Sequence, residues 1–504
     1  MVLTNEGIKD GKEWESRGYK MPSFDREKVT QKTRQNPKWI HFGAGNIFRA
    51  FQANICQKLL NEGLDDTGLI VAEGYDYEII EKYNRAHDDL SVLVTLKSDG
   101  TVEKTVVASI VESCILDSEN EAEMARLKEI FRAPSLQMVS FTITEKGYKT
   151  KSYMSKVTAL LLERYKAGRL PLAFVSMDNC SHNGDKLKEA VVGIAADFIK
   201  EGKCDSGFLD YIKDPKCVSF PLSMIDKITP RPDKAIEDML MKDGLENFEP
   251  IVTEKNTFVA PFVNAEETEY LVIEDKFPNG RMPLEKAGVI FTDRETVDKT
   301  EKMKVCTCLN PLHTALAIFG CLFGYKTIHD EMNDKELAKL VTMLGEKEGM
   351  KVVVDPKVIS PQEFLSAVLK KRLPNPFMPD TPQRIACDTS QKLPIRFGET
   401  IKAYRKRSDL DTRELTLIPF VLAGYLKYLT GVDDEGNKFE QSPDPLLGEL
   451  KELEPEEVLR RQDVFGVNLY EDTLADKILK IYEKMQGKGS VRKELEYYVD
   501  TVLA

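Results

Sequence analysis

The chain has 504 residues, of which 42% are hydrophobic and 31% charged, and its formal net charge is −12 at pH 7. These values are typical of a globular protein with two or three domains, and the acidic balance argues against nucleic acids and anionic membranes as partners. No apolar run approaches the roughly 18 residues of a membrane helix, the N-terminus lacks a signal pattern, and the nine cysteines form no CxxC pair, so we expect a cytoplasmic protein with reduced thiols.

The first motif in the chain is a glycine-rich turn between an apolar strand and a helix. Residues 1–37 are polar with weak periodicity, and we predict that they form an extension wrapping the first domain. Trp39–Phe42 predicts a short buried strand, and we assign to cofactor binding the run that follows it, Gly43-Ala44-Gly45-Asn46-Ile47-Phe48-Arg49. Gly43 permits the tight turn, and Gly45 lets the backbone approach a pyrophosphate at the positive end of the helix. The sequence therefore predicts a dinucleotide-binding fingerprint.

An acidic residue ends the second predicted strand. Thr67–Ala72 predicts that strand, and Glu73 follows it. A carboxylate in this position accepts hydrogen bonds from both hydroxyls of the adenosine ribose and repels a 2′-phosphate, which favours NAD over NADP. The separation from Gly43 to Glu73 is longer than the usual spacing of about 20 residues, so Asp76 is a rival for the role. For either acid the alternative is a solvated turn.

Two later strands of the same domain end in polar residues. Met138–Thr144 predicts one strand and Arg169–Met177 predicts another, while Leu90–Thr95 and Val102–Val111 predict a hairpin. In an open parallel sheet, ligands bind beyond the carboxyl ends of the strands. We therefore place four residues beside the cofactor, Thr144, Glu145, Asp178 and Asn179, and expect Asn183 at the same edge.

Helical patterns dominate after about residue 292. We predict helices at 312–324, 334–345, 361–371, 411–430, 445–462 and 472–504. The predicted fold is therefore an α/β, Rossmann-type N-terminal domain over residues 38–291 and a mostly α-helical C-terminal domain over residues 292–504.

One polar stretch precedes the most apolar run of the second half. Lys304, Asn310 and His313 place an amine, a carboxamide and an imidazole within ten residues. Pro311 suits a first helical position and disfavours the helical region for the residue before it, so we predict an N-cap or kink at Asn310 and a helix from about Pro311 to Phe323. Residues three apart share a helix face, so this stretch suits proton transfer and ligand binding. The alternative is a capped core helix with a satisfied histidine and a surface lysine.

A second polar segment contains three cations around a proline-containing bend. Arg384, Lys392 and Arg396 suit the clamping of a carboxylate or of sugar hydroxyls, and the alternative is an exposed basic loop. Asp226 stands beside a lysine, and from these residues alone the interpretation as a surface pair leads. No two of the five histidines are at helical metal-ligand spacing, so the sequence predicts no histidine-based metal site.

Together these pieces resemble the polyol-specific long-chain dehydrogenases, also called the mannitol dehydrogenase family, from about residue 38 to nearly the C-terminus. The joint occurrence of the family's motifs in this order is specific. The motifs are the GxG turn with Phe48-Arg49-Ala50, Thr142–Tyr148, Asp178-Asn179 with Asn183-Gly184, Met224–Pro230, Ile273–Arg281, Lys304 with Asn310 and His313, and Arg384 with Asp388 and Lys392.

The resemblance implies metal-independent oxidation of a secondary alcohol with NAD, in a cleft between two domains. It implies that Lys304 is the catalytic base, that Asn183 and Asn310 hold the reacting oxygen, and that Glu301 relays protons. It also implies substrate-positioning roles, for His313, Asp226, Arg384 and Lys392, to which we add Arg396.

The sequence departs from the family between the lysine and the asparagine. Lys304 and Asn310 are six residues apart, where the family has five. Either the chain bulges by one residue before the helix, or Lys302 is the base.

The cations of the second segment favour an acidic substrate, so we expect a fructuronate reductase-like enzyme that interconverts D-fructuronate and D-mannonate with NAD. Mannitol 2-dehydrogenase and tagaturonate reductase activities are the alternatives within the family. From other classes, the alternatives are a non-catalytic NAD-linked sugar-acid sensor and an isomerase that uses bound NAD transiently. The expected partners are a sugar acid or polyol, with the chain a monomer or weak homo-oligomer.

Overall fold

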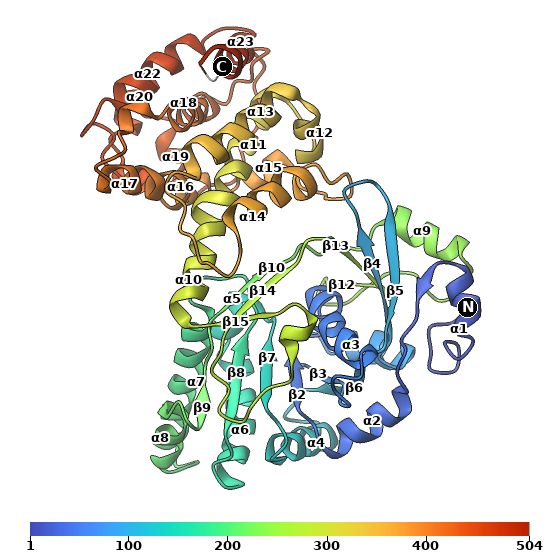
Figure 1. Cartoon of the computed structure of the whole chain (residues 1–504). Helices are drawn as coiled ribbons and strands as arrows, with labels where there is room; N and C mark the ends of the chain where they lie inside the picture. The colour runs from blue at the N-terminus through green and yellow to red at the C-terminus, as the bar shows by residue number, and fades with distance from the viewer. Residues whose placement is uncertain (503–504) are drawn as a thin grey trace. The chain divides into compact units, whose positions relative to one another are not determined.

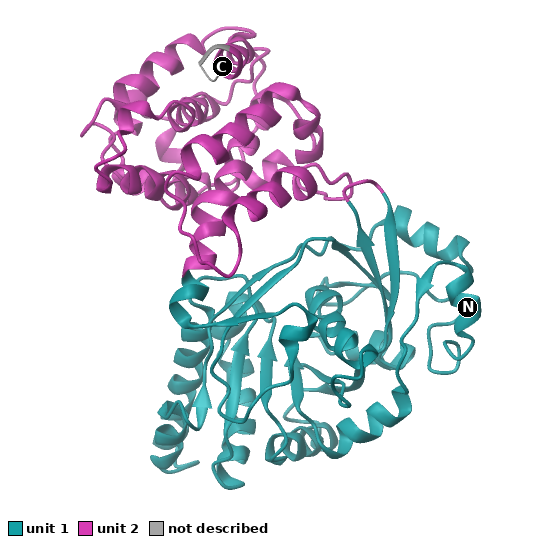
Figure 2. Cartoon of the chain, in the orientation of Figure 1, with its two compact units in different colours: residues 1–97, 101–298 teal, residues 98–100, 299–504 magenta. Residues whose placement is uncertain are grey.

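The computed structural model describes residues 1–502, which form two compact units (Figure 2). Unit 1 comprises residues 1–97 and 101–298, and unit 2 comprises residues 98–100 and 299–504. The described strands lie in the first unit and the second is built from helices. This confirms the predicted fold class, a Rossmann-type α/β domain and a mostly helical domain.

Unit 1 is built around a six-stranded sheet whose neighbouring strands all run parallel (Figure 1). In spatial order the strands are β6 (Ile110–Ile115), β3 (Leu69–Glu73), β2 (Trp39–Phe42), β7 (Met138–Phe141), β8 (Leu172–Ser176) and β9 (Val218–Ser219). Counted along the chain, this is the doubly wound order 3-2-1-4-5-6, whose switch point lies between β2 and β7. The carboxyl ends of β2, β3, β7 and β8 therefore share the edge at which such sheets bind ligands.

Successive side chains of the central strands enter two separate cores, one on each face of the sheet. Trp39 and Val71 pack in the core that includes α3 (Ala53–Asn61). Ile40 and Phe42 pack in the core with α6 (Lys151–Lys166) and α7 (Asn183–Lys200), which lie along one side of the sheet in Figure 1. Because strands buried on both faces are apolar throughout, the sequence identifies them as continuous apolar runs.

Smaller sheets complete unit 1. The predicted hairpin is confirmed, because β4 (Ser91–Leu96) and β5 (Val102–Val107) pair antiparallel, but its second strand was predicted too long. The chain leaves the hairpin after Val107 and enters β6 of the main sheet at Ile110; the residues on both sides of this junction are apolar, so no breaker residue marks it. The other strands are β1 (Tyr19–Lys20) and β13 (Phe262–Glu266) beside the hairpin, the sheet of β10 (Ser223–Asp226), β14 (Tyr270–Glu274) and β15 (Ile290–Thr292), and the pair β11 (Ile251–Val252) and β12 (Phe258–Val259).

Unit 2 is organised around α11 (Asn310–Phe323), which packs against α15 (Pro382–Ala386) and α18 (Leu417–Leu429). The other helices used below are α12 (Ile328–Asn333), α16 (Thr389–Leu393) and α17 (Glu399–Lys406), with the π-helical turns η7 (Val368–Arg372) and η8 (Pro394–Gly398). The range predicted as one helix at 445–462 is instead broken into short helices, with α20 (Pro455–Val458) starting at a proline.

A helical run covers residues 294–323, from α10 (Arg294–Lys302) through the π-helical turn η5 (Met303–Cys308) into α11, interrupted only at Leu309, whose φ of −129° and ψ of −63° are not helical. By length and composition this run passes the test for a membrane span. However, 78% of its most apolar window is buried inside the protein, as is usual for the core helix of a globular domain.

Candidate active site

The glycine turn lies beyond the carboxyl end of β2, and its two glycines are expected for different reasons, one for the fold and one for the ligand. Gly43 has a φ of 109°, and a Cβ there would lie 2.4 Å from the carbonyl oxygen of Thr142, so the fold itself requires glycine. A Cβ on Gly45 would meet no atom within 4 Å. Gly45 and the neighbouring Asn46 and Ile47 are half-buried. The open space beside Gly45 fits the close approach of a pyrophosphate.

The side chains of Phe48 and Arg49 belong to the core of unit 1. Phe48 stacks on His41, with ring centroids 4.2 Å apart. The Arg49 guanidinium donates to the carbonyl of Ala260 at 2.7 Å and lies 4.4 Å from the centre of the Tyr83 ring. Because both side chains are used in packing, only their backbone groups remain available for the cofactor contact predicted here.

Glu73 ties the end of β3 to the glycine turn. Its Oε2 accepts the N–H of Ala44 at 2.9 Å, and its Oε1 accepts the N–H groups of residues 74–76. Burial raises the pKa of Glu73, and the four N–H donors oppose this shift. The rival Asp76 instead accepts the hydroxyl of Thr253 at 2.6 Å. Of the two acids, Glu73 is the one that lies against the turn.

Asp178 links the ends of β7 and β8. Its carboxylate accepts the N–H groups of Ile143 at 3.1 Å and Thr144 at 2.9 Å, and the hydroxyl of Tyr148 at 2.5 Å. Thr144 has a φ of 64°, which is unusual for a β-branched residue and is held by these contacts. Of the other two residues predicted here, Glu145 is half-buried and Asn179 is exposed.

The amide of Asn183 is fully occupied within unit 1. Its Nδ2 donates to the carbonyl of Asp178 at 2.9 Å and to the carbonyl and hydroxyl oxygens of Ser223, each at 3.0 Å. Its Oδ1 accepts the N–H groups of Ser223 at 3.1 Å and Gly184 at 2.8 Å. Asn183 therefore joins the start of α7 to β8 and β10. Asp226, the last residue of β10, is also buried.

The lysine and asparagine of unit 2 are joined by a helix with one extra residue. Lys304 lies in η5, and the N–H of Leu309 donates to the Lys304 carbonyl at 3.1 Å, five residues back. Such π-helical turns insert one residue into an α-helix, so the six-residue spacing has a direct structural cause. Lys304 is 3% exposed, whereas Lys302 is exposed. Asn310 is the first residue of α11 rather than its N-cap, which is Leu309.

His313 lies among cations. Its Nε2 has no hydrogen bond within the described residues and is 3.6 Å from Oδ2 of Asp380. Burial lowers the pKa of His313 to about 3, and the positive charges that add to this shift come from Arg396, Arg384, Arg372 and Lys392. His313 is therefore a neutral imidazole near pH 7, set in a positive environment.

The three predicted cations have different partners. Arg384 forms an ion pair with Asp380. Lys392 donates to the carbonyls of Ile385 and Cys387, and its pKa is lowered by burial and then by Arg396. Arg396 donates to the hydroxyl of Thr314, and burial lowers its pKa to about 10. The reading as an exposed basic loop does not hold for Lys392 and Arg396, which are both partly buried.

The sequence did not predict two residues of this cluster, Asp380 and Arg372. Asp380 lies beside two residues assigned to the substrate, His313 and Arg384. In the sequence it precedes Arg384 by four residues, the spacing of an ordinary helical ion pair, so nothing marks it as part of a site. Arg372 follows two other basic residues and reads as part of a solvated run, yet it is buried while Lys370 and Lys371 are exposed. Only tertiary structure separates such residues from surface charge.

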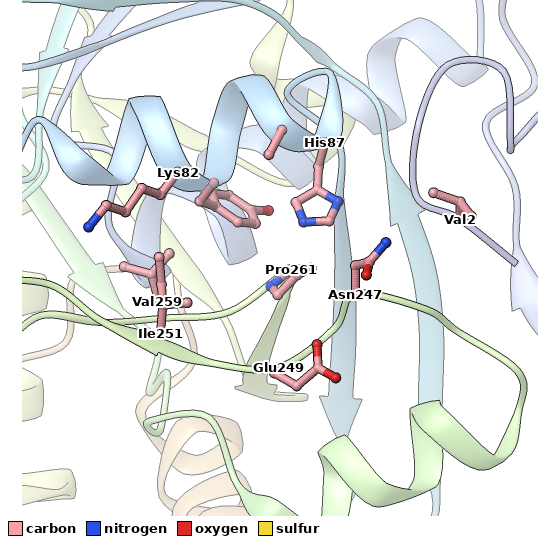
Figure 3. Close-up of a pocket in the computed structure, with 10 residues that line it drawn as sticks. Val2, Lys82, His87, Asn247, Glu249, Ile251, Val259 and Pro261 are labelled. Atoms are coloured by element: carbon pink, nitrogen blue, oxygen red, sulfur yellow. The ribbon is translucent and has the colours of Figure 1, made fainter.

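A cavity of about 370 Å³ in unit 1 contains none of the predicted site residues (Figure 3). It lies between the segment carrying Lys82 and His87 and the chain from Asn247 to Pro261. Burial lowers the pKa of His87, whose Nδ1 is 3.2 Å from the carbonyl of Leu3. This cavity is distinct from the glycine turn.

The predicted residues thus fall into two sets. Unit 1 gathers the glycine turn, Glu73, Thr144 and Asp178 at one edge of its sheet, with Asn183 at the start of α7. Unit 2 gathers His313, Arg384, Lys392 and Arg396 near the first turn of α11. Glu301, on α10, is half-buried. Within residues 1–502, no three His, Cys, Asp or Glu side chains are grouped as a metal site requires.

Comparison with known proteins agrees with this arrangement. Residues 37–286 match the mannitol dehydrogenase Rossmann domain and residues 296–486 match the mannitol dehydrogenase C-terminal domain. The chain is 52% identical to the D-mannonate oxidoreductase of Thermotoga maritima over 99% of both chains, and 28% identical to the polyol:NADP oxidoreductase of Gluconobacter oxydans over 82% of this chain and 84% of that one. Its fold resembles that of Pseudomonas fluorescens mannitol 2-dehydrogenase, solved with NAD and D-mannitol, with a TM-score of 0.71 and 24% identity over 99% of this chain and 100% of that one. The chain therefore belongs to the mannitol dehydrogenase family.

Proposed function

We propose that the protein is an NAD-dependent oxidoreductase that interconverts a hexonate and a keto-hexuronate, D-mannonate and D-fructuronate. The observation that carries the choice of an acid is the cation cluster around His313. Neutral sugar hydroxyls do not need this surplus of positive charge, whereas a carboxylate does. The Thermotoga maritima relative, 52% identical over its whole length, bears the name D-mannonate oxidoreductase, which agrees with this choice.

The residues at the sheet edge of unit 1 fit NAD. The open position beside Gly45 suits a pyrophosphate, and the Glu73 carboxylate lies where the adenosine ribose of such folds is bound. A carboxylate repels a 2′-phosphate, so we assign NAD although one relative is named for NADP. Bound NAD would supply the acceptance and return of a hydride.

Lys304 is the proposed proton carrier. Oxidation of a secondary alcohol requires removal of the hydroxyl proton, and reduction requires its return. Lys304 is buried, whereas Lys302 is exposed to bulk water, so only Lys304 lies in a site from which water can be excluded. We therefore assign proton transfer to Nζ of Lys304, with Glu301 as the proposed relay.

Asn310 and Asn183 are the proposed donors to the reacting oxygen, but their amide groups differ in whether they are already hydrogen-bonded. The Asn310 side chain makes no hydrogen bond within the described residues, whereas the Asn183 amide is occupied by Ser223 and Asp178. Carboxamides stabilise a developing alkoxide without titrating themselves. We propose that Asn310 supplies the first donor and that Asn183 joins only by releasing Ser223.

A substrate panel tests the proposal. Reduction of NAD is followed by absorbance with D-mannonate, D-altronate and D-mannitol at equal concentrations. We expect D-mannonate to give the highest kcat/KM. D-mannitol as the best substrate would overturn the choice of an acid, and absent turnover with intact NADH binding would favour the sensor. The nine cysteines are all free thiols, which suits the proposed cytoplasmic location, and we propose a monomer or weak homo-oligomer.

A further inference from the structure

Asp380 connects two residues that are assigned to the substrate. Its Oδ1 pairs with Nη2 of Arg384, and its Oδ2 lies 3.6 Å from Nε2 of His313. The Asp380 side chain is 7% exposed, so this carboxylate is a fixed part of the unit. Its backbone is held as well, because its carbonyl accepts the N–H of Ile328 at 2.9 Å. One rigid carboxylate therefore holds the arginine by an ion pair and lies beside the imidazole.

Arg396 is held in a different way. Its guanidinium donates to the hydroxyl of Thr314, and within residues 1–502 it forms no ion pair. Thr314 donates in turn to the carbonyl of Asn310 at 3.0 Å, so the guanidinium lies at the first turn of α11. That end of a helix is positive, and Lys392, four residues before Arg396, adds a like charge. A partly buried guanidinium in such surroundings is stabilised by an anion.

We propose that Asp380 is a positioning residue that holds Arg384 and His313 for the hydroxyls of the substrate, and that it thereby leaves Arg396 to bind the carboxylate of the sugar acid. This inference rests on the proposed function and assigns the acid group within that site. The charge of Arg384 is already compensated, and a second carboxylate beside it would be repelled by Asp380. Arg396 has no such competitor, so it gains the full charge-assisted hydrogen bond.

The test compares D-mannonate with D-mannonamide, in which a neutral amide replaces the carboxylate. Arg396→Gln should raise KM for D-mannonate about tenfold or more, the value of a charge-assisted hydrogen bond, while KM for D-mannonamide changes by less than about threefold. Arg396→Lys should recover part of the preference for the acid. Asp380→Asn should lower kcat about tenfold for both substrates and keep the preference, because it misplaces Arg384 and His313 but leaves Arg396 intact.

Two results would overturn the assignment. The first is a preference for the acid that survives in Arg396→Gln and disappears in Arg384→Gln. The second is an unchanged kcat in Asp380→Asn. Arg407→Gln is the matched control, because Arg407 is an exposed arginine of the same unit, paired with Asp409, and its loss changes the net charge equally. If Asp380→Asn fails to fold, Asp380→Glu keeps the charge, displaces it, and should still lower kcat.

Calorimetric binding separates this inference from the proposed reaction. Titration of the NADH-loaded protein with D-mannonate and D-mannonamide measures the preference without turnover. Wild-type protein that binds the acid more tightly but turns over neither compound contradicts the proposed reaction, and the loss of that preference in Arg396→Gln still supports the assignment. Wild-type protein that turns over both compounds with equal KM supports the reaction and contradicts the assignment.

Discussion

The N–H of Ala44 donates to Oε2 of Glu73 at 2.9 Å, which joins the turn after β2 to the end of β3. The same carboxylate receives the N–H groups of residues 74–76 on its other oxygen. Glu73 therefore shapes the backbone on which the pyrophosphate and the ribose are proposed to lie. We propose that Glu73 combines this support of the loop with recognition of the ribose.

Replacing this carboxylate should weaken cofactor binding. In Glu73→Gln an amide NH₂ faces N–H donors, so we expect the Kd for NADH to rise about tenfold or more. Asp76→Asn should change it less than about threefold, because Asp76 is bonded to Thr253. Fluorescence titration with NADH measures both constants. A larger effect of Asp76→Asn would transfer the ribose role to that residue.

The two glycines of the turn should respond in opposite ways to alanine. Gly43→Ala places a Cβ 2.4 Å from the Thr142 carbonyl at a φ of 109°, so we expect a loss of stability of about 3 kcal/mol or more. Gly45→Ala should fold normally, because its Cβ meets nothing within 4 Å, but should weaken NADH binding about tenfold or more. Urea unfolding and NADH titration of both variants check the pair. Normal NADH affinity in Gly45→Ala would remove the pyrophosphate from this position.

Lys304→Ala should abolish proton transfer and leave the cofactor site intact. We expect kcat to fall about 10²–10⁴-fold, the usual contribution of a general acid or base, with little change in the Kd for NADH. Lys302→Ala is the matched control, because Lys302 is exposed at the end of α10, and it should keep nearly normal turnover. The reverse result would make Lys302 the base.

Stability at acidic pH should depend on His41. This residue is buried on β2, within hydrogen-bond distance of the hydroxyls of Ser140 (2.6 Å) and Thr142 (2.8 Å), and burial lowers its pKa to about 3. Because the unfolded chain has the higher pKa, of about 6.5, His41 stabilises the fold above pH 6.5 and loses this contribution as the pH falls towards 3. His41→Gln should reduce the slope of unfolding free energy against pH by about 1.4 kcal/mol per unit between these values. Urea titrations at several pH values measure the slope, and an unchanged slope would contradict the burial of a neutral imidazole.

Glu331 should weaken the protein at high pH. Its carboxyl lies against Gly320, neither oxygen has a hydrogen bond within the described residues, and burial raises its pKa well above the ordinary value. The folded state therefore keeps a proton that the unfolded state loses, so stability falls as the pH rises above about 4.5. Glu331→Gln should be more stable than wild type at pH 8 by about 1–3 kcal/mol, with the gain shrinking towards pH 5. A gain that does not depend on pH would show that packing, and not ionisation, is responsible.

The sequence predicts those parts of the fold that depend on patterns within a short stretch of neighbouring residues. The apolar run Trp39–Phe42, the glycine turn and the acid Glu73 follow one another closely enough to define the order of the first strands. The residues that escaped prediction depend on contacts between distant positions. The partner of Asn183, Ser223, comes forty residues later, and Asp380 lies 3.6 Å from His313 of α11, an element far earlier in the chain. Neither pair leaves a periodic trace in the sequence.

The π-helical turn that ends with the hydrogen bond from Leu309 N–H to the Lys304 carbonyl also determines which way the following side chains point. Each residue of an α-helix advances the side chain by about 100° around the axis, whereas a π-helical turn absorbs one additional residue, so the residues after it keep the phase of a helix that is one residue shorter. Asn310 and His313 are therefore turned by roughly a quarter of a circle from where an uninterrupted helix would aim them. Deleting one residue of 305–308 should therefore restore a regular helix with the lysine and the asparagine five residues apart, and both side chains should keep the face they occupy now. The same deletion in a regular α-helix would swing every later side chain to another face.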